Sequence, residues 1–305
     1  MLKYMLRRLC MAVGVALTVS IVCFMLLHLS GDLATAIAGP EATAEQVAKI
    51  RVQFGLNQPI LVQYFHWLWG ALHFNFGNSY YFPDSVSSLI SQRLPITMAL
   101  GGIALAVATF IAIPLGVIAA IKQDTWIDRL ALLVAVFGQA MPSFFFSLVL
   151  IIVFAVTLHW LPVAGNGSWR NFILPAIALG YYATPSIMRL TRTGMLEVLG
   201  SDYIRTARAK GISETKVVLK HALRNAVIPV VALLAVELGF MLGGSVVVES
   251  IFSLQGLGQL AWDSISRNDY PVVQAIVLII ALFYIVLTFL ADMLNALLDP
   301  KLRIA

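Results

Sequence analysis

The sequence predicts an all-α protein that crosses a membrane six times and has both termini in the cytoplasm. Three observations lead to this prediction: the composition, the length of the apolar runs, and the distribution of lysine and arginine. Of the 305 residues, 60% are hydrophobic and 11% are charged, and the mean hydropathy is +0.90. So few charged groups could not cover a soluble fold of this size without exposing large apolar patches. The composition therefore excludes soluble enzymes and predicts that the chain is solvated by lipid.

Six apolar runs are long enough to cross a bilayer. A helix needs about 20 mostly apolar residues for this, because its backbone N–H and C=O groups must bond within the segment. The six predicted spans are residues 9–29, 95–121, 130–158, 172–188, 226–248 and 272–291. The third span contains Pro142, so we expect a tilt or a kink there. The fourth span is short and contains Pro175 and Pro185.

The first span has an alternative interpretation as a secretory signal peptide. Lys3, Arg7 and Arg8 precede it, and small residues at 34–36 follow it. Its apolar run is longer than the roughly 7–15 residues of a signal-peptide core, which favours a retained membrane helix. The predicted orientation of the later spans is the same under either interpretation.

The lysine and arginine residues set the predicted orientation, because short cytoplasmic loops carry an excess of them. With the N-terminus inside, 15 of the 20 Lys and Arg residues lie in inner segments and five lie in outer segments. The inner segments are 1–8, 122–129, 189–225 and 292–305, and the outer ones are 30–94, 159–171 and 249–271. The formal net charge of +5 therefore indicates topology, and no nucleic-acid partner is predicted.

The chain has no recognisable internal repeat, low-complexity segment or soluble domain. We therefore divide it into three parts along the membrane topology. Residues 1–94 hold the first span and outer interfacial helices, residues 95–291 form the core transmembrane domain, and residues 292–305 form a cytoplasmic tail.

The outer connection, 30–94, is predicted to form short helices that lie on the membrane. Thr43 and Gln46 have the spacing of a capping box, and Gly55 supplies a helix stop. A second helix is predicted to begin near Pro59, and its aromatic rings belong at the lipid headgroups. These rings are Tyr64, Phe65, Trp67 and Trp69. An interfacial anchor is the favoured interpretation, and a gate or a docking surface for an outside partner is the alternative.

The inner connection, 189–225, carries eight Lys and Arg residues and three acidic ones. Two short helical patterns are divided by Gly211, and Tyr203, Ala207 and Gly211 follow one another at one-turn spacing. This spacing predicts a small-residue surface that a groove on another protein could approach closely. Ser213 is a candidate N-cap for the next helix. On composition alone, the alternative is that the basic residues only satisfy the positive-inside bias or contact anionic lipid.

The order of residues in this connection matches a known pattern. The stretches DYIRTARAKG at 202–211 and HALRNA at 221–226 resemble the cytoplasmic coupling loop of binding-protein-dependent ABC importer permeases, in the dipeptide, oligopeptide and nickel branch. The general family pattern is Glu-Ala-Ala, three residues, Gly, nine residues, Ile-x-Leu-Pro. The departures, which are similar to that branch's own variant, are Arg205 and Thr206 for Glu and the first Ala, and His221 and Arg224 for Ile and Pro.

The likeness extends along nearly the whole chain. Several short matches in the same order, separated by spans in the corresponding places, are more specific than any one of them. The further matching stretches are GLNQP at 55–59, RLPIT at 93–97, ESIFSLQGLG at 249–258, DYPVVQ at 269–274 and Asp299-Pro300.

The resemblance implies the type I importer permease architecture in a bacterial inner membrane. The implied function is that of the membrane-spanning subunit of an ATP-driven importer for di- or oligopeptides or peptide-like solutes. The implied partners are a second homologous permease subunit, two cytoplasmic ABC ATPases that bind ATP and Mg²⁺, and a periplasmic or extracellular solute-binding protein. This chain lacks the G-x-x-x-x-G-K-[ST] phosphate loop, so no cofactor is expected on it. The implied ATPase-coupling residues are Asp202, Tyr203, Arg205, Thr206, Ala207, Ala209, Gly211, His221 and Arg224.

Three polar residues within the spans are candidates for the translocation pathway: Glu237, Gln139 and Ser245. A carboxylate in mid-membrane costs about 2.5–3.5 kcal/mol on insertion scales, so Glu237 should face a cavity or a partner, or be protonated. A hydrogen-bonded or protonated carboxyl between helices is the favoured interpretation, and contact with the amino end of a peptide-like substrate is the functional alternative. For Gln139, near the break expected at Pro142, an interhelical contact is the favoured interpretation, and a place in the lining of a passage is the alternative.

Two rival functions are an intramembrane hydrolase and an ATP-independent secondary transporter or channel. A hydrolase needs a nucleophile with a base, and the last span has no His or Lys that could activate Ser245. No H-E-x-x-H motif occurs, and His28 and His221 stand apart from other metal ligands, so neither catalytic residues nor a metal site is predicted. Topology alone leaves the secondary transporter open. The resemblance of the coupling loop favours the importer.

Overall fold

The described part of the chain is helical. The computed structural model describes residues 2–29, 32–39 and 41–298, without the side chains of residues 2–4, 26–29, 36, 138, 139, 297 and 298. Its α-helices are α1 (Leu2–Leu29), α2 (Leu33–Ala38), α3 (Ala44–Gln53), α4 (Ile60–Leu72), α5 (Val86–Ile121), α6 (Trp126–Ala140), α7 (Ser143–Leu150), α8 (Ile173–Leu199), α9 (Asp202–Ala209), α10 (Glu214–Lys216), α11 (Leu223–Ala226), α12 (Ile228–Ile251), α13 (Leu257–Ser266) and α14 (Tyr270–Leu298). Two π-helices, η1 (Ile151–Thr157) and η3 (Val217–Ala222), and the 3-10 helix η2 (Trp169–Phe172) complete the elements. The predicted all-α class is confirmed.

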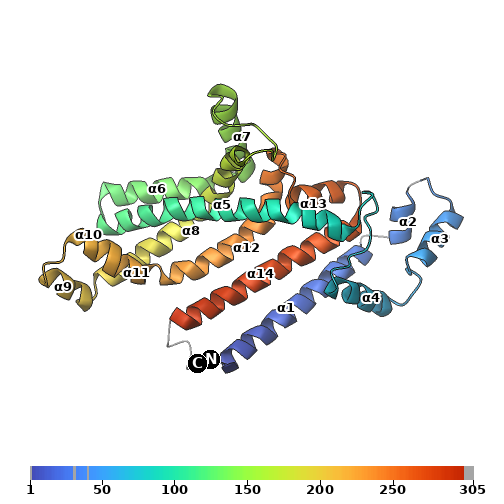
Figure 1. Ribbon diagram of the computed structural model, residues 1–305, viewed down its shortest axis with the longest axis horizontal. Helices are drawn as coiled ribbons and strands as arrows, with labels where there is room; N and C mark the ends of the chain where they lie inside the picture. The colour runs from blue at the N-terminus through green and yellow to red at the C-terminus, as the bar shows by residue number, and fades with distance from the viewer. Residues whose placement is uncertain (1, 30–31, 40, 299–305) are drawn as a thin grey trace.

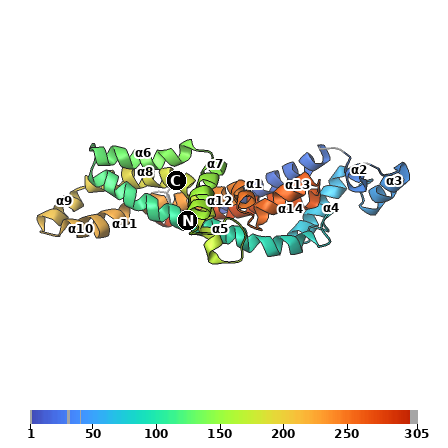
Figure 2. The ribbon, with the colours of Figure 1, turned by 90° about the horizontal axis from the view of Figure 1, so that it is seen from above.

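The helices form an elongated molecule (Figures 1 and 2). The short helices α9, α10 and α11 lie at one end of the long axis, and α2 and α3 lie at the other end. The helix α13 lies on the side of α2 and α3, far from α9. The basic inner connection and the outer connection are therefore separated along the length of the molecule.

Within the described residues, four helices are long and apolar enough to cross a membrane. These segments are Met5–Met25, Val86–Ile121, Ile228–Ile251 and Tyr270–Ala296, which correspond to the predicted spans one, two, five and six. The predicted fourth span, 172–188, falls on α8 from the span's second residue onward. The helix α8 is long enough but less apolar, and it continues to Leu199. The inner connection therefore begins as helix, and its loop starts at Gly200 instead of residue 189.

The predicted third span, 130–158, is not a single helix. The helix α6 ends at Ala140, and Met141 is extended with a ψ of 134°. Proline disfavours helical backbone in the residue before it, so Pro142 causes this ending. The chain restarts at Ser143 as α7, which points away from α6 (Figure 1), and continues into η1. The expected kink is thus a complete break, and a continuous helix over 130–158 is wrong.

The core lies where α5 packs along α8. Ala104, Ala108 and Ala112 of α5 are fully buried. Gly180 of α8 approaches so closely that a Cβ there would overlap the backbone oxygen of Ala104, and a Cβ on Gly116 would lie 2.8 Å from the backbone oxygen of Met188. Helices in lipid attract one another mainly through such close packing of small residues. The remaining helices assemble on this pair.

The helices α1 and α14 lie beside each other outside this core (Figure 1). Arg8 of α1 forms an ion pair of 2.7 Å with Asp292 of α14. The hydroxyl of Ser20 in α1 shares a hydrogen bond of 2.8 Å with the buried hydroxyl of Tyr64 in α4. Polar contacts thus join α1 to the last helix and to the outer helix α4.

The outer helices begin and end where the sequence predicts. The capping box between Thr43 and Gln46 is present at the start of α3. Gly55 has a φ of +66° just after this helix, a conformation that favours glycine. The helix α4 begins directly after Pro59 and exposes Phe65 and Trp69. Its role as an interfacial anchor stays a prediction.

The loop before α5 is tied to the turn between α13 and α14. The fully buried carboxylate of Asp269 accepts hydrogen bonds from the Ser79 hydroxyl and, at 3.1 Å, from the backbone N–H of Tyr80. The guanidinium of Arg267 lies 3.8 Å from the centre of the Tyr81 ring. Burial and the nearby Asp269 charge raise the pKa of Tyr80 to about 12. This phenol is therefore neutral at physiological pH, and the loop is fixed to the end of the helical body.

Candidate coupling surface and membrane cavity

The helix α9 is held on the molecule by one apolar side. Ile204 is fully buried and Ala207 is 7% exposed. Both belong to a buried cluster that also contains residues of α5, α8, η3 and α11: Val117, Ala120, Met195, Val217, Val218, Ala222 and Ala226. Burial of one isoleucine side chain contributes about 1.5–3 kcal/mol. This cluster joins α9 to the ends of two long helices, α5 and α8.

Hydrogen bonds fix the orientation of α9. The Tyr203 hydroxyl accepts a hydrogen bond of 2.7 Å from the Asn225 side chain and donates one of 3.4 Å to the backbone oxygen of His221. Arg208 donates two hydrogen bonds, of 2.6 and 3.1 Å, to the Glu214 carboxylate across the turn. The hydrogen bonds from Arg208 lower the pKa of the Glu214 carboxyl. The start of α9 is thus bonded to η3 and α11, and its end is bonded to α10.

Most of the predicted coupling residues lie on the surface, with Ala207 as the exception. The exposed ones are Asp202, Tyr203, Arg205, Thr206, Ala209, Gly211 and Arg224. His221 is half-buried. Ala207 faces the buried cluster, so the expectation that it forms part of a partner-facing surface is wrong. The one-turn spacing of Tyr203, Ala207 and Gly211 does not create a common exposed face, because the apolar side of α9 turns inward.

Gly211 ends α9 in the way the sequence predicts. Its φ is +72°, a left-handed conformation that favours glycine. A Cβ at this position would meet no atom within 4 Å, so the requirement for glycine is conformational and not one of space. Ser213 precedes α10, but its side chain makes no capping hydrogen bond.

A buried ion pair supports the same end of the molecule. Asp128, at the start of α6, is 3% exposed. Arg192 of α8 donates to its two carboxylate oxygens at 2.8 and 2.7 Å, and the backbone N–H of Asp124 donates at 3.1 Å. A two-point Arg–carboxylate pair holds geometry better than a single contact. The turn between α5 and α6 is therefore fastened to α8 close to the α9 cluster.

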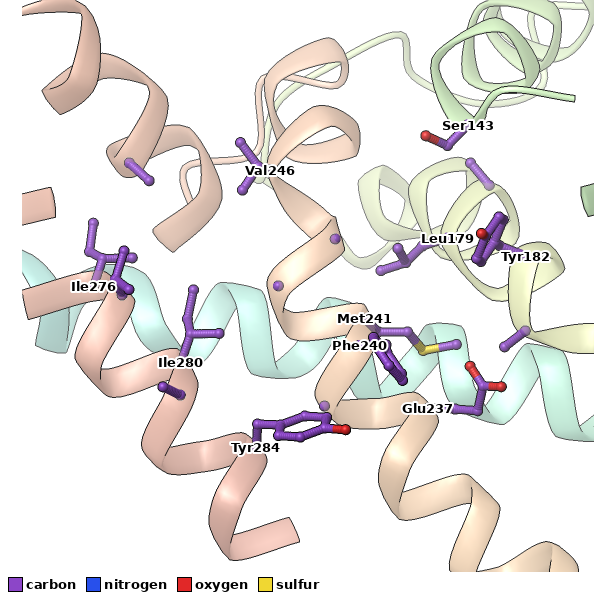
Figure 3. Close-up of a pocket in the computed structure, with 18 of the residues that line it drawn as sticks. Ser143, Leu179, Tyr182, Glu237, Phe240, Met241, Val246, Ile276, Ile280 and Tyr284 are labelled. Atoms are coloured by element: carbon purple, nitrogen blue, oxygen red, sulfur yellow. The ribbon is translucent and has the colours of Figure 1, made fainter. Parts of the chain in front are cut away.

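A large cavity lies between the membrane helices. Its volume is about 1340 Å³, and residues of α1, α8, α12, α13, α14 and the break around Pro142 line it. Figure 3 shows Glu237 and Met241 on the side of α12 nearest Tyr182 of α8. Ser186 of α8 also lines the cavity, near the Glu237 carboxyl. Among the described residues that line the cavity, Glu237 is the one Asp, Glu, Lys or Arg side chain.

The other two pathway candidates do not join Glu237. Ser245 is 1% exposed and donates a hydrogen bond of 3.1 Å to the backbone oxygen of Leu242, while its neighbours Gly244 and Val246 line the cavity. The expectation that Ser245 lies on the pathway is wrong, because its side of α12 packs inside the protein. The side chain of Gln139 lies outside the described residues.

Sequence reasoning missed a second acidic residue of α12, Glu249. It lies beyond the predicted fifth span, in a segment assigned to the outer surface, yet it is fully buried. Its carboxylate accepts hydrogen bonds from the Thr97 hydroxyl and from the N–H groups of Gly258 and Gln259. The signal that could have found it is the glycine-rich ESIFSLQGLG run, because closely spaced glycines permit a backbone to approach a buried group.

The fold and these features define a class of protein. A chain of apolar helices that surrounds a cavity, and that supports a charged helix at one end, is a multi-pass membrane transport protein. The chain belongs to the family of binding-protein-dependent transport system inner membrane components, whose model matches residues 112–304. The model of the N-terminal part of such membrane components matches residues 1–101.

Individual relatives agree with this assignment. The chain is 43% identical to the glutathione transport system permease protein GsiC of Salmonella typhimurium strain LT2, over 304 residues that cover 99% of each chain. It is 42% identical, with the same coverage, to GsiC of Escherichia coli strain K12. Among solved structures, the inward-facing MetNI methionine ABC transporter matches with a TM-score of 0.59 at 19% identity, over 69% of this chain and 96% of that chain. That likeness shows a shared fold.

The predicted family and function class are thereby confirmed. The chain is a permease component of a binding-protein-dependent ABC importer in a bacterial inner membrane, and it is a transport subunit and not an enzyme. Membership of this family implies ATPase and solute-binding-protein partners.

Proposed function

We propose that this permease imports a small peptide or a peptide-like solute of the glutathione type. In the proposed complex it pairs with a second homologous permease subunit. One of two ATPases, which bind ATP and Mg²⁺, seats on α9 from the cytoplasm, and the other seats on the second permease subunit. An external binding protein delivers the solute. The end that carries α9 is the cytoplasmic one, since the positive-inside rule places the basic segments there.

The single observation that supports coupling through α9 is its buried cluster. Ile204 and Ala207 pack with Val117 of α5 and Met195 of α8 in one apolar group. Packed interiors transmit displacement because they are nearly incompressible. A movement of the ATPase seated on the exposed face of α9 therefore reaches α5 and α8 without a flexible link. The exposed Asp202, Arg205 and Thr206 are proposed to contact the ATPase.

The cavity supports the proposed substrate class. A dipeptide or glutathione has one ammonium group, carboxylates and amides, and a cavity of about 1340 Å³ accommodates a molecule of this size. Glu237 supplies a negative charge for the ammonium group. The hydroxyls of Tyr182, Ser186 and Tyr284, which also line the cavity, are suited to hydrogen-bond amides and carboxylates. Glutathione is the first candidate because the relatives at 42–43% identity are named for its transport.

Reconstitution tests this proposal. The chain is purified with its partner permease and ATPases, placed in vesicles with the binding protein, and supplied with labelled glutathione, a dipeptide or an oligopeptide. We expect solute accumulation that requires both the binding protein and ATP hydrolysis, with a non-hydrolysable ATP analogue as the matched control. Transport by this chain with no ATPase bound would instead identify a secondary transporter or channel. Thermal stabilisation of the binding protein by each solute ranks the substrates independently.

Replacing Glu237 by glutamine tests the role of the cavity carboxylate. The substitution keeps the side-chain shape and removes the charge, so uptake of solutes with a free amine should fall about tenfold, the effect of losing roughly 1.4 kcal/mol. Uptake of the N-acetylated solutes should change much less, because they carry no ammonium group. The matched control is Glu45→Gln, which removes a charge from the exposed helix α3. Equal losses for both kinds of solute would refute amine recognition by Glu237.

A further inference from the structure

The carboxylate of Glu249 is buried far from the coupling surface and has no role in the proposed function. It lies near the end of α12 and is fully inaccessible. One oxygen accepts a hydrogen bond of 2.8 Å from the Thr97 hydroxyl of α5. The other oxygen accepts hydrogen bonds of 2.7 and 3.1 Å from the backbone N–H groups of Gly258 and Gln259 in the first turn of α13. A single side chain thus joins three helices.

Thr97 completes a closed set of hydrogen bonds. Its oxygen also accepts a hydrogen bond of 2.8 Å from the backbone N–H of Leu257, the first residue of α13. Three consecutive N–H groups at the start of α13, which have no partner within the helix, therefore bond to Glu249 or Thr97. The ten-residue helix α13 also presents its positive end to the carboxylate. Both carboxyl oxygens of Glu249 therefore have hydrogen-bond donors, and none of these donors is a lysine or an arginine.

Two glycines make this arrangement possible. A Cβ on Gly256 would overlap the Glu249 carboxylate and would lie 2.6 Å from the Thr97 hydroxyl oxygen. A Cβ on Gly258 would lie 2.6 Å from the Cα of Val246 on α12. The backbone of α13 is therefore in direct contact with the backbone of α12. Hydrogen bonds and close packing hold the two helices at the same point.

The opposite side of α13 lacks such fixed polar contacts. Leu260 and Ala261 pack there with Val272 and Ile276 of α14 in an apolar cluster. Among the described side chains, Gln259 Oε1 and Ser264 Oγ of α13 and Gln274 Nε2 of α14 are buried without a hydrogen-bond partner. Directional bonds thus fix α13 to α5 and α12, whereas the residues it shares with α14 form an apolar cluster. We therefore expect α13 to move more easily relative to α14 than relative to α5 and α12.

The fixed helix also forms a wall of the transport cavity. Ala261 and Ile265 of α13 line the cavity together with residues of α12 and α14. Figure 1 shows α13 away from α9, on the side of the outer helices α2 and α3. With the orientation proposed above, α13 lies at the outer end of the cavity. The element that Glu249 positions is therefore part of the outer end of the cavity wall.

We propose that Glu249 and Thr97 form a latch that makes α13 a rigid unit with α12 and the outer part of α5, so that α13 moves with α12 as the outer gate of the cavity. In this assignment Glu249 is a positioning residue that acts through α13 and does not touch the solute. The inference rests on the proposed ATP-driven importer, because the gate must follow movements of α5 that begin at α9. The latch is expected to stay closed in both the inward-facing and the outward-facing state.

The substitution pair Thr97→Val and Thr97→Ser tests the latch. Valine has a similar shape but no hydroxyl, so the N–H of Leu257 and one Glu249 oxygen lose their partner, whereas serine keeps the hydroxyl. In the reconstituted importer, we expect Thr97→Val to lower the solute transported per ATP hydrolysed by about tenfold, the effect of one lost hydrogen bond to a charged group. Thr97→Ser should restore the wild-type ratio. A general loss of folding would lower transport and ATP hydrolysis together, and a parallel loss of this kind would contradict the proposal.

Hydrogen exchange in the unmodified importer provides a test that does not depend on any variant. The backbone amides of residues 257–259 should exchange slowly both without nucleotide and with ATP trapped in the ATPases, because their acceptors stay in place in both states. Exchange that accelerates by about tenfold or more in one state would show that the latch opens during the cycle, and the rigid-unit proposal would be wrong. This measurement reports on the latch even if the complex moves no solute, so its failure is distinct from failure of the proposed function.

Discussion

Replacing Ala207 by arginine is expected to abolish uptake while the chain stays in the membrane. Ala207 is 7% exposed and packs in the cluster that joins α9 to α5 and α8. A guanidinium cannot be accommodated there without either an unpaired buried charge or displacement of α9. An unsatisfied buried charge costs several kcal/mol, so α9 should detach from its support. The membrane helices are apolar whether or not α9 is attached, so the chain should still insert into the membrane.

The measurement compares uptake, ATP hydrolysis and membrane content in the reconstituted importer. Uptake should fall by about 100-fold or more, which corresponds to roughly 3 kcal/mol at 1.4 kcal/mol per tenfold. The stimulation of ATP hydrolysis by the loaded binding protein should disappear as well. Ala207→Ser is the matched control, because serine is nearly as small and should retain most of the uptake. Normal transport by the arginine variant would contradict coupling through the α9 cluster.

Replacing Gly180 by alanine is expected to reduce the amount of folded protein. Gly180 lies against the backbone of Ala104 at the contact between α5 and α8, and an added Cβ would overlap the Ala104 oxygen. Backbone atoms cannot rotate away as a flexible side chain can, so the two central helices must separate. Overpacking of a tight core costs about 1–3 kcal/mol. This loss of stability affects the contact between α5 and α8, on which the remaining helices assemble.

The content of folded protein after detergent extraction measures this effect, together with the midpoint of thermal unfolding. Gly102→Ala is the matched control, since Gly102 lies on α5 and a Cβ there would meet no atom within 4 Å. Alanine is preferred over glycine in helices by about 0.5–1 kcal/mol, so this control should be neutral or slightly stabilising. If both variants behave alike, the close approach of α5 and α8 at Gly180 is not a stabilising feature of the fold.

Local signals in the sequence predicted the ends of elements well. The capping box at Thr43, the helix stops at Gly55 and Gly211, and the interruption at Pro142 each depend on the conformational limits of one or two residues. Such limits act within a few residues of the chain, so they can be read without the fold. The length of α8 was underestimated because its polar end, beyond residue 188, packs against other helices and does not need to be apolar.

The orientation of side chains around the helices was less predictable. Ala207 was expected on a partner-facing surface, and Ser245 was expected on the pathway. Both expectations were based on residue type and helical spacing. Spacing indicates which residues share a face of a helix, but it does not indicate what that face contacts. The partners of Ala207, such as Val117, are distant in the sequence, and those of Glu249 are Thr97 and Gly258. Contacts of this kind form only when separate helices come together.

The sequence by itself determined that this protein is a membrane protein. The reason is that hydrophobicity is a property of each residue, and a long apolar run is what a membrane-spanning helix requires. The sequence also determined the family, since an ordered set of short motifs survives without knowledge of the fold. Only the tertiary structure decided which side of α9 is buried, that Glu237 faces the cavity, and that Glu249 joins three helices. The physical reason is that the role of a buried polar group depends on the groups that it contacts. Thr97, which donates a hydrogen bond to Glu249, lies more than 150 residues from it in the sequence.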